Sequence, residues 1–217
     1  MSGVALWLRW SWRDLRARWL QVAAIALIIA IGSGTYSGLT SVSAWRQASY
    51  DASYDALDMY DLRVALTTGS FADADRLLAA AAAIPHAADI AAAEPRLEVP
   101  IQVDASTADE LVLVPGRLVG VDVRDGGPHV SGIATVEGRG LRPDDAAGDT
   151  VVVDEHLVQR HDLAPTGTLR LSGGRELRYV GTGLSPENFF PVDDRGSVFA
   201  DFAVVYAPLS TVQRVGG

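Results

Sequence analysis

"AIALIIAIGSGTYSGLTSVSAW", residues 24–45, contains no charged side chain and decides the class of this protein. It belongs to an uncharged run of 27 residues between Arg18 and Arg46. A helix that crosses the core of a bilayer needs about 20 residues. The run therefore predicts a transmembrane helix over residues 19–45, with the lipid bilayer as its surroundings.

Charge is divided unevenly on the two sides of this run. Residues 1–18 hold four of the 18 basic residues and one of the 27 acidic residues, which leaves them at +3 and the remainder of the chain at −12. The positive-inside rule predicts a cytoplasmic N-terminus and an extracytoplasmic main domain in the cell (cytoplasmic or inner) membrane. An acidic body also argues against nucleic acid as a partner, because phosphates require a basic surface.

A cleaved signal peptide is the main alternative to a membrane anchor. Val42-Ser43-Ala44 is an acceptable cleavage site, and the basic start fits a signal sequence. The segment between Ile31 and Ala44 is long for the region before a cleavage site. The length of the uncharged run thus favours the anchor, and a mature protein that starts near Trp45 would contradict it.

Small residues recur every fourth position within the predicted span. They are Ala26, Ala30, Gly34 and Gly38, and they end in a GxxxG pattern. Such a ridge lets a second transmembrane helix approach closely. An alanine-rich chain also produces such a pattern by chance, so packing against another helix remains a hypothesis.

The segment before the span predicts a basic amphipathic helix over residues 1–18. Arg9, Arg13 and Arg16 form one stripe. An adjacent stripe is apolar and consists of Leu8, Trp12, Leu15 and Trp19. This pattern is typical of the membrane–water interface. It indicates either a flank that only sets topology or a helix that also contacts a cytoplasmic partner.

The chain beyond the span predicts a helical stalk and then a mixed domain. Residues 46–60 place Tyr50 and Tyr54 on one helix face, with a helix end near Met59. Residues 61–217 predict an α+β domain in which strands dominate. Strands are expected at 61–66, 96–103, 150–153 and 198–207, with Pro100 at an edge or bulge of the second of these. Two further strands are expected within 111–123, on either side of a turn at Pro115-Gly116. A hairpin is expected to turn at Gly173-Gly174. Helices are expected at 71–84, after residue 153 and from Pro208 onward.

The composition and motifs indicate no catalytic, cofactor or metal site. The chain has no cysteine and no lysine, which excludes a thiol nucleophile and a Walker A loop. His156 and His161 lack the spacing of a zinc-binding helix. Ser185 in "GLSPE" is not in a GxSxG elbow. We expect a protein that is not an enzyme.

The order of these segments resembles the permease subunits of the FtsX-like/MacB-type ABC transporter family. The resemblance is carried by "RWSWRDLRARWLQ" before one span, by "VEGRGLRPDDAAGDTVVVDEHLVQRHDLAPTGTLRL", and by "GLSPENFFPV" followed by "FAVVYAPLSTVQRV". It implies an extracytoplasmic MacB-like core domain after the first transmembrane helix. It also implies a homodimer or heterodimer of permeases and a separate cytoplasmic ABC ATPase that hydrolyses ATP.

Under this resemblance the site residues acquire expected roles. Arg9, Arg13 and Arg16 would face the ATPase, the small-residue ridge would pack against a further helix, and Tyr50 and Tyr54 would lie on the stalk that transmits motion. Family members continue with three more transmembrane helices, so the chain is expected to be the N-terminal part of a permease. The alternative is a single-pass anchored extracytoplasmic binding or adaptor protein.

Overall fold

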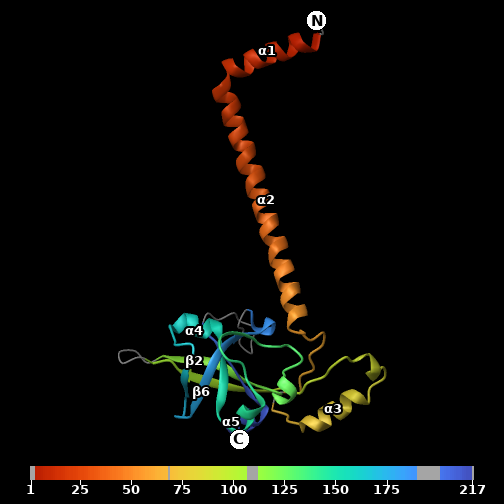
Figure 1. Cartoon of the computed structure of the whole chain (residues 1–217), viewed down its shortest axis with the longest axis vertical. Helices are drawn as coiled ribbons and strands as arrows, with labels where there is room; N and C mark the ends of the chain where they lie inside the picture. The colour runs from red at the N-terminus through yellow and green to blue at the C-terminus, as the bar shows by residue number, and fades with distance from the viewer. Residues whose placement is uncertain (1–2, 68, 107–111, 190–200, 217) are drawn as a thin grey trace. The chain divides into compact units, whose positions relative to one another are not determined.

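The computed structural model of this chain describes residues 3–67, 69–106, 112–189 and 201–216. The chain divides into two compact units, Met1–Asp51 and Ala52–Gly217. The first unit is helical and the second contains the sheet (Figure 1). The expected fold class is confirmed, because a long apolar helix precedes a strand-rich domain with helices.

Two helices account for the N-terminal part of the chain. Helix α1 spans Gly3–Ala17 and α2 spans Trp19–Ala56. Arg18 separates them, and its carbonyl accepts the N–H groups of Gln21 and Val22. The 38 residues of α2 correspond to about 57 Å of helix. By length and composition α2 can cross a membrane, and a signal sequence near an N-terminus would have the same properties.

Residues 46–56 of the predicted stalk belong to α2, which ends at Ala56, three residues earlier than expected. Asp58 has a φ of 48°, in the left-handed region. That conformation stops a right-handed helix, so the chain turns away from the helix axis directly after Leu57.

The second unit is built on one sheet of seven strands. In chain order these are β1 (Leu97–Asp104), β2 (Leu113–Val121), β3 (Ala134–Gly138), β4 (Thr150–Asp154), β5 (Gly167–Leu171), β6 (Glu176–Leu184) and β7 (Ala203–Pro208). Their order across the sheet is β3-β6-β4-β7-β2-β1-β5, and β5 pairs in addition with β6. The pairing thereby closes into a ring of six strands, to which β3 is added as a further strand.

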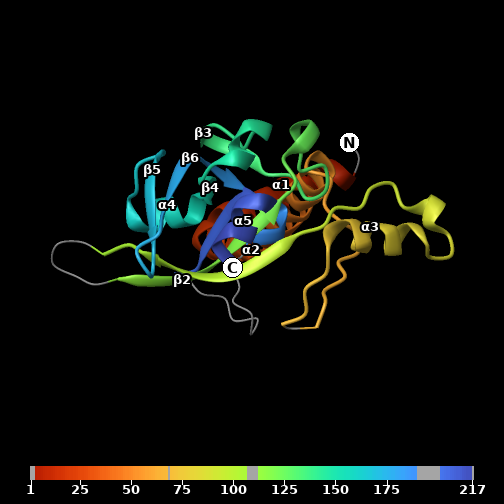
Figure 2. The same cartoon turned by 90° about the horizontal axis from the view of Figure 1, so that it is seen from below.

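Short helices complete the domain. The α-helices are α3 (Ala74–Ala82), α4 (Glu155–His161) and α5 (Leu209–Gly216), and the 3-10 helices are η1 (Ala87–Asp89), η2 (Arg124–Gly126), η3 (Pro143–Ala147) and η4 (Pro186–Asn188). Helix α5 lies across the sheet, with contacts to β1, β2 and β7 (Figure 2). Helix α3 lies to one side of the sheet in both views (Figure 1, Figure 2).

Both faces of the central strands are buried. Val151 and Val153 belong to one apolar cluster, which also contains residues of α4 and α5. Val152 points the other way, into a second cluster with Tyr206. Successive side chains of a strand point to opposite faces, so the Val-rich β4 is fully covered. The segment 122–149 covers the second cluster through residues that include Ile133 and Leu141.

Several element predictions are confirmed. The hairpin turns at Gly173 and Gly174, whose φ values of 93° and 81° favour glycine. Strand β1 pairs with β5 only at Val103 and Asp104. Pro100 therefore lies on the part of β1 that is open on one side, as proline in a strand requires.

Two strand predictions are wrong. Residues 61–66 form no ladder with any described residue. The side chain of Arg63 turns toward Glu98 and Glu187. The alternation of an extended chain then turns Leu62 and Val64 outward, where they are 78% and 80% exposed. No apolar face is buried there to hold a strand.

The predicted Pro115-Gly116 turn is also wrong, because β2 runs through both residues. The pairing of β2 with β7 begins only at Gly116. Pro115 thus lies where β2 has one neighbouring strand, and its missing N–H is tolerated there. Gly116 is required for a different reason, since a Cβ at this position would lie 2.2 Å from the carbonyl oxygen of Ala203.

Candidate functional site at the end of helix α2

The two residues directly after α2, Leu57 and Asp58, are joined to the domain by backbone hydrogen bonds within the second unit. The carbonyl of Leu57 accepts the N–H of Gly132 at 2.7 Å, and the carbonyl of Asp58 accepts the N–H of Ser131 at 2.8 Å. The carbonyl groups at the end of a helix have no partners within it. Here the partners are supplied by a loop more than 70 residues further along the chain, so the helix end is fixed to the domain.

Ser131 is the centre of this junction. It is fully buried and has a φ of 49°. Its hydroxyl accepts the N–H of Tyr60 and donates to the sulfur of Met59, each at 3.4 Å. Backbone and side chain of one residue therefore hold Asp58, Met59 and Tyr60. We call Leu57–Tyr60 together with Ser131 and Gly132 the helix junction.

Arg96 holds the loop that contains Ser131 in place. Its guanidinium group donates to the carbonyls of Val130 and Ser131, the latter at 2.9 Å. It also forms an ion pair with Glu187 at 2.7 Å. The side chains of Arg96 and Glu187 are 16% and 10% exposed. A planar guanidinium suits this task, because its fixed fork of donors reaches several oxygens at once.

Charged side chains extend the junction across the domain. Arg63 pairs with Glu98 at 2.6 Å and with Glu187 at 3.0 Å. Arg117 on β2 pairs with Glu98 at 3.5 Å and lies over the ring of Phe202, 5.2 Å from its centroid. We call Arg63, Arg96, Glu98, Arg117 and Glu187 the charge network. It ties the segment after α2 to β1, β2 and η4.

The 3-10 helix η4 and the residue after it supply three successive side chains with three different partners. Glu187 belongs to the charge network. Asn188 is buried and donates from Nδ2 to the hydroxyl of Tyr206 at 2.8 Å. Phe189 stacks on Tyr54 of α2, with ring centroids 6.3 Å apart and an interplanar angle of 25°. This short turn thus contacts helix α2, the charge network and the core of the sheet.

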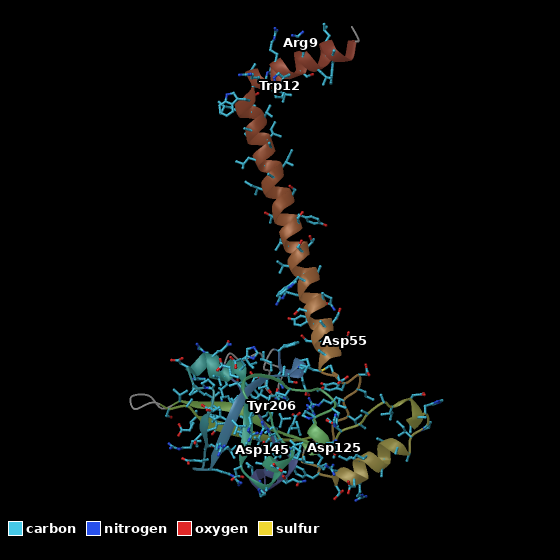
Figure 3. The ribbon with its side chains drawn as sticks, in the orientation of Figure 1. Arg9, Trp12, Asp55, Asp125, Asp145 and Tyr206 are labelled. Carbon is cyan, nitrogen blue, oxygen red and sulfur yellow. The ribbon has the colours of Figure 1, made fainter. Side chains whose placement is uncertain are left out.

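Tyr206 is the core partner of this turn. It lies in β7 and is fully buried; Figure 3 labels it within the second unit. Burial raises the pKa of its hydroxyl, and the charge of Asp154 raises the pKa further. The hydroxyl of Tyr206 accepts the hydrogen bond from Asn188 and so connects the turn to the core.

The residues predicted from sequence are divided between the two units. Of the predicted stalk residues, Tyr54 lies in the second unit and contacts Phe189 beside η4, whereas Tyr50 lies in the first unit. Arg9, Arg13 and Arg16 lie exposed on α1, on which Figure 3 labels Arg9 and Trp12. The small-residue ridge lies exposed along α2, from Ala26 and Ala30 to Gly34 and Gly38. The roles expected for the arginines and the ridge stay predictions.

The main residues of the junction were missed by sequence reasoning. Arg96 and Ser131 stand in no motif, and Glu187 lies in "GLSPE", whose serine drew attention only as a nucleophile. The pattern Ser-Pro-Glu-Asn at 185–188 did hold a usable signal, because serine before Pro-Glu is typical of the first turn of a helix.

A pocket of about 320 Å³ lies beside the junction. Leu57, Ile133, Leu141 and Val152 contribute apolar walls, and Asp58 is the one ionisable side chain among the described residues of the lining. A pocket with a single exposed carboxylate offers no pair of groups for acid–base chemistry.

Asp154 and His156 form a separate polar site at the end of β4. The Oδ1 atom of Asp154 accepts the backbone N–H of His156 at 2.9 Å and lies 2.8 Å from its Nδ1. His161 lies 3.7 Å from Asp201. Among the described residues no three histidine or acidic side chains are grouped so that they could hold a metal ion. Asp154 serves as the N-cap of α4.

We expect Asp154→Asn to raise the free energy of unfolding at neutral pH by roughly 1 kcal/mol. Burial raises the pKa of Asp154, and its hydrogen bonds with His156 lower that pKa by less. The folded-state pKa of Asp154 lies above the usual value of 3.8. The free energy of unfolding of the native protein therefore decreases as pH rises from 3.8 through the folded-state pKa. Asparagine stays neutral and is an equally good cap. Chemical denaturation between pH 4 and pH 8 measures the difference.

The matched control for this prediction is Asp144→Asn, since Asp144 is an exposed aspartate of η3. We expect no pH-dependent difference from the unmodified chain in that variant. The stabilisation by Asp154→Asn should shrink toward pH 4. A constant difference at all pH values would show that the buried charge is not its cause.

No family model matches this sequence, and no curated protein matches it either. The fold is similar to the crystal structure of the extracellular domain of the noncanonic ABC-type transporter YknZ from Gram-positive bacteria, with a TM-score of 0.43 and 9% sequence identity. The similarity covers 65% of this chain and 65% of the YknZ chain, which is just under two thirds of that chain. It concerns the backbone alone and identifies no residue of the junction.

Proposed function

We propose that this chain belongs to a permease subunit of an ABC-type transporter or mechanotransmission complex of the FtsX-like/MacB type. In this proposal α2 spans the membrane, α1 lies on the cytoplasmic side and the second unit is extracytoplasmic. ATP hydrolysis takes place in a separate cytoplasmic subunit. The division of charge around α2 supports this orientation.

The observation that carries the proposal is the helix junction. A simple membrane anchor needs only a flexible connection to its domain. Here the ring contact of Tyr54 holds the last turn of α2, and the carbonyl–amide bonds of Leu57 and Asp58 hold the two residues directly after it. Such a connection passes a displacement of the helix on to the domain, which is what a protein coupled to a cytoplasmic ATPase requires.

The experiment that tests this function is purification of the tagged chain from its native membrane in a mild detergent. We expect an ABC ATPase and either a second permease or a second copy of this chain to copurify. Because the chain contains no cysteine, a cysteine placed at Asp144 provides a clean topology probe. It should react with an impermeant maleimide added outside the cell.

A second candidate function is a single-pass extracytoplasmic binding or adaptor protein. It rests on the same apolar helix α2, which by length and composition can cross a membrane and would anchor the second unit. Under this alternative no ATPase copurifies, while Asp144→Cys is still labelled from outside. Failure of the external labelling would contradict both candidates.

We expect Gly34→Leu and Gly38→Leu to abolish assembly with the other membrane subunits without unfolding the chain. An added Cβ at either glycine has no neighbouring atom within 4 Å in the structure, so the helix itself tolerates the change. Close helix approach in a membrane does not tolerate it. Copurification of the partners after each substitution measures the effect.

The matched control is Tyr36→Leu, about 200° around the helix from Gly34. This variant should retain its partners, because it adds no bulk to the ridge. If Gly34→Leu and Gly38→Leu keep the partners as well, the ridge has no role in assembly.

A further inference from the structure

The η4 turn, with Phe189 directly after it, contacts both the end of α2 and the core of the sheet. Phe189 stacks on Tyr54, and the neighbouring Asn188 donates to Tyr206 in β7. The N–H of Asn188 is in turn held by the carbonyl of Ser185 at 2.9 Å. The ring contact and the core hydrogen bond are therefore one residue apart along a short, internally bonded turn.

The same turn also reaches the helix junction by a second route. Glu187 pairs with Arg96, whose guanidinium holds the carbonyl of Ser131. Ser131 in turn binds Asp58 and Tyr60. Two chains of contacts thus lead to η4, one from Tyr54 of α2 through the stacked rings and one from Asp58 and Tyr60, directly after α2, through charged side chains. The charged route is largely shielded from solvent, because Glu187 and Arg96 are mostly buried.

From these contacts we propose that η4 is the coupling element through which α2 acts on the sheet, and that Glu187, Asn188 and Phe189 are its positioning residues. A displacement of Tyr54 shifts Phe189, and the turn carries the shift through Asn188 to Tyr206. The central place of Tyr206 favours an effect on the whole sheet, because β7 lies between β4 and β2. The role of this element in transport rests on the proposed function, whereas the coupling itself is a property of this chain.

Hydrogen exchange of the whole chain in lipid nanodiscs tests the coupling. We expect Tyr54→Ala to raise exchange about tenfold at residues 185–189 and at β7, although the ring contact of Tyr54 is to Phe189 and not to β7. The reciprocal variant Asn188→Ala should raise exchange at the amides of Ser131 and Gly132, which bind the carbonyls of Asp58 and Leu57 directly after α2. Tyr54→Phe keeps the stacked ring and should behave like the unmodified chain.

Two controls separate coupling from loss of stability. The turn end of the β5–β6 hairpin, residues 170–177, takes no part in the two chains of contacts, so its exchange should stay unchanged in each variant. Phe71→Ala removes a ring that is 80% exposed and should leave exchange unchanged throughout. Exchange that rises only at residues 52–60 would overturn the proposal. A uniform rise that includes the hairpin turn would overturn it too, because it would mark general unfolding.

A cross-link distinguishes failure of this inference from failure of the proposed function. Tyr54→Cys and Phe189→Cys can be joined by a short bismaleimide without interference from native cysteines. Because the two cysteines remove both rings of the contact, the unjoined pair should lower ATP turnover of the complex about tenfold, and the joined pair should restore it. Unchanged turnover in the unjoined pair would overturn the coupling role. If no ATPase is found but the exchange results hold, the proposed function fails and the coupling element stands.

Discussion

Gly116→Ala is expected to destabilise the domain by about 3 kcal/mol or more, because the added methyl group meets backbone that has no room to move. A Cβ at this position would lie 2.2 Å from the carbonyl oxygen of Ala203 and 2.7 Å from its Cβ. Both strands are in the centre of the sheet, where Gly116 begins the pairing of β2 with β7. The backbone of Ala203 cannot shift without disturbing the buried strand β7. Chemical denaturation followed by near-UV circular dichroism measures the loss.

Gly148→Ala is the matched control, because an added Cβ there meets its nearest atom at 3.9 Å. We expect its free energy of unfolding to lie within about 0.5 kcal/mol of that of the unmodified chain. If Gly116→Ala unfolds at the same denaturant concentration as Gly148→Ala, the close approach of β2 to β7 at Ala203 does not exist.

Arg96→Ala is expected to cost about 3 kcal/mol of folding free energy and to loosen the helix junction. The substitution removes the mostly buried ion pair with Glu187 and the donors to the carbonyls of Val130 and Ser131. Carbonyl groups that remain buried without donors add to the cost. The same denaturation experiment measures stability, and hydrogen exchange at Gly132 reports on the junction.

Arg170→Ala is the control for this substitution. The side chain of Arg170 is 61% exposed, and its ion pairs with Asp104 and Glu176 are 3.9 Å and 3.4 Å long. Exposed pairs of this kind contribute less than about 1 kcal/mol.

The double variant Arg96→Ala/Glu187→Ala should cost less folding free energy than the sum of the two single variants, because it leaves neither charge behind without its partner. Strict additivity would show that the two side chains do not interact.

The strands that could be predicted are those in which the pattern of apolar side chains in the sequence matches the side chains that are buried. In β4 three successive valines point to two apolar clusters, and in the β5–β6 hairpin the turn glycines mark the register. Strand β3 was not predicted, because all five of its residues are exposed and it pairs with β6 along one edge. Residues 61–66 show the opposite error. Their alternation is strand-like, yet the ion pairs of Arg63 turn the apolar side outward.

The helix junction could not be predicted from local patterns. Tyr60 and Ser131 are 71 positions apart, and Arg96 and Glu187 are 91 positions apart. Each residue is ordinary in its own neighbourhood, and only the order of the strands brings them together. Tyr54 was placed on a helix face by its spacing, but nothing in that spacing named Phe189 as its partner.

The sequence by itself determined the long apolar helix, its charge asymmetry and the α+β character of the chain beyond it. These features depend on composition and on periodicities of a few residues, which the chain carries locally. Tertiary structure alone decided where α2 ends, which loop receives it, and which charges surround it. Those outcomes depend on contacts between residues far apart in the chain, and such contacts exist only after the sheet has brought distant segments side by side.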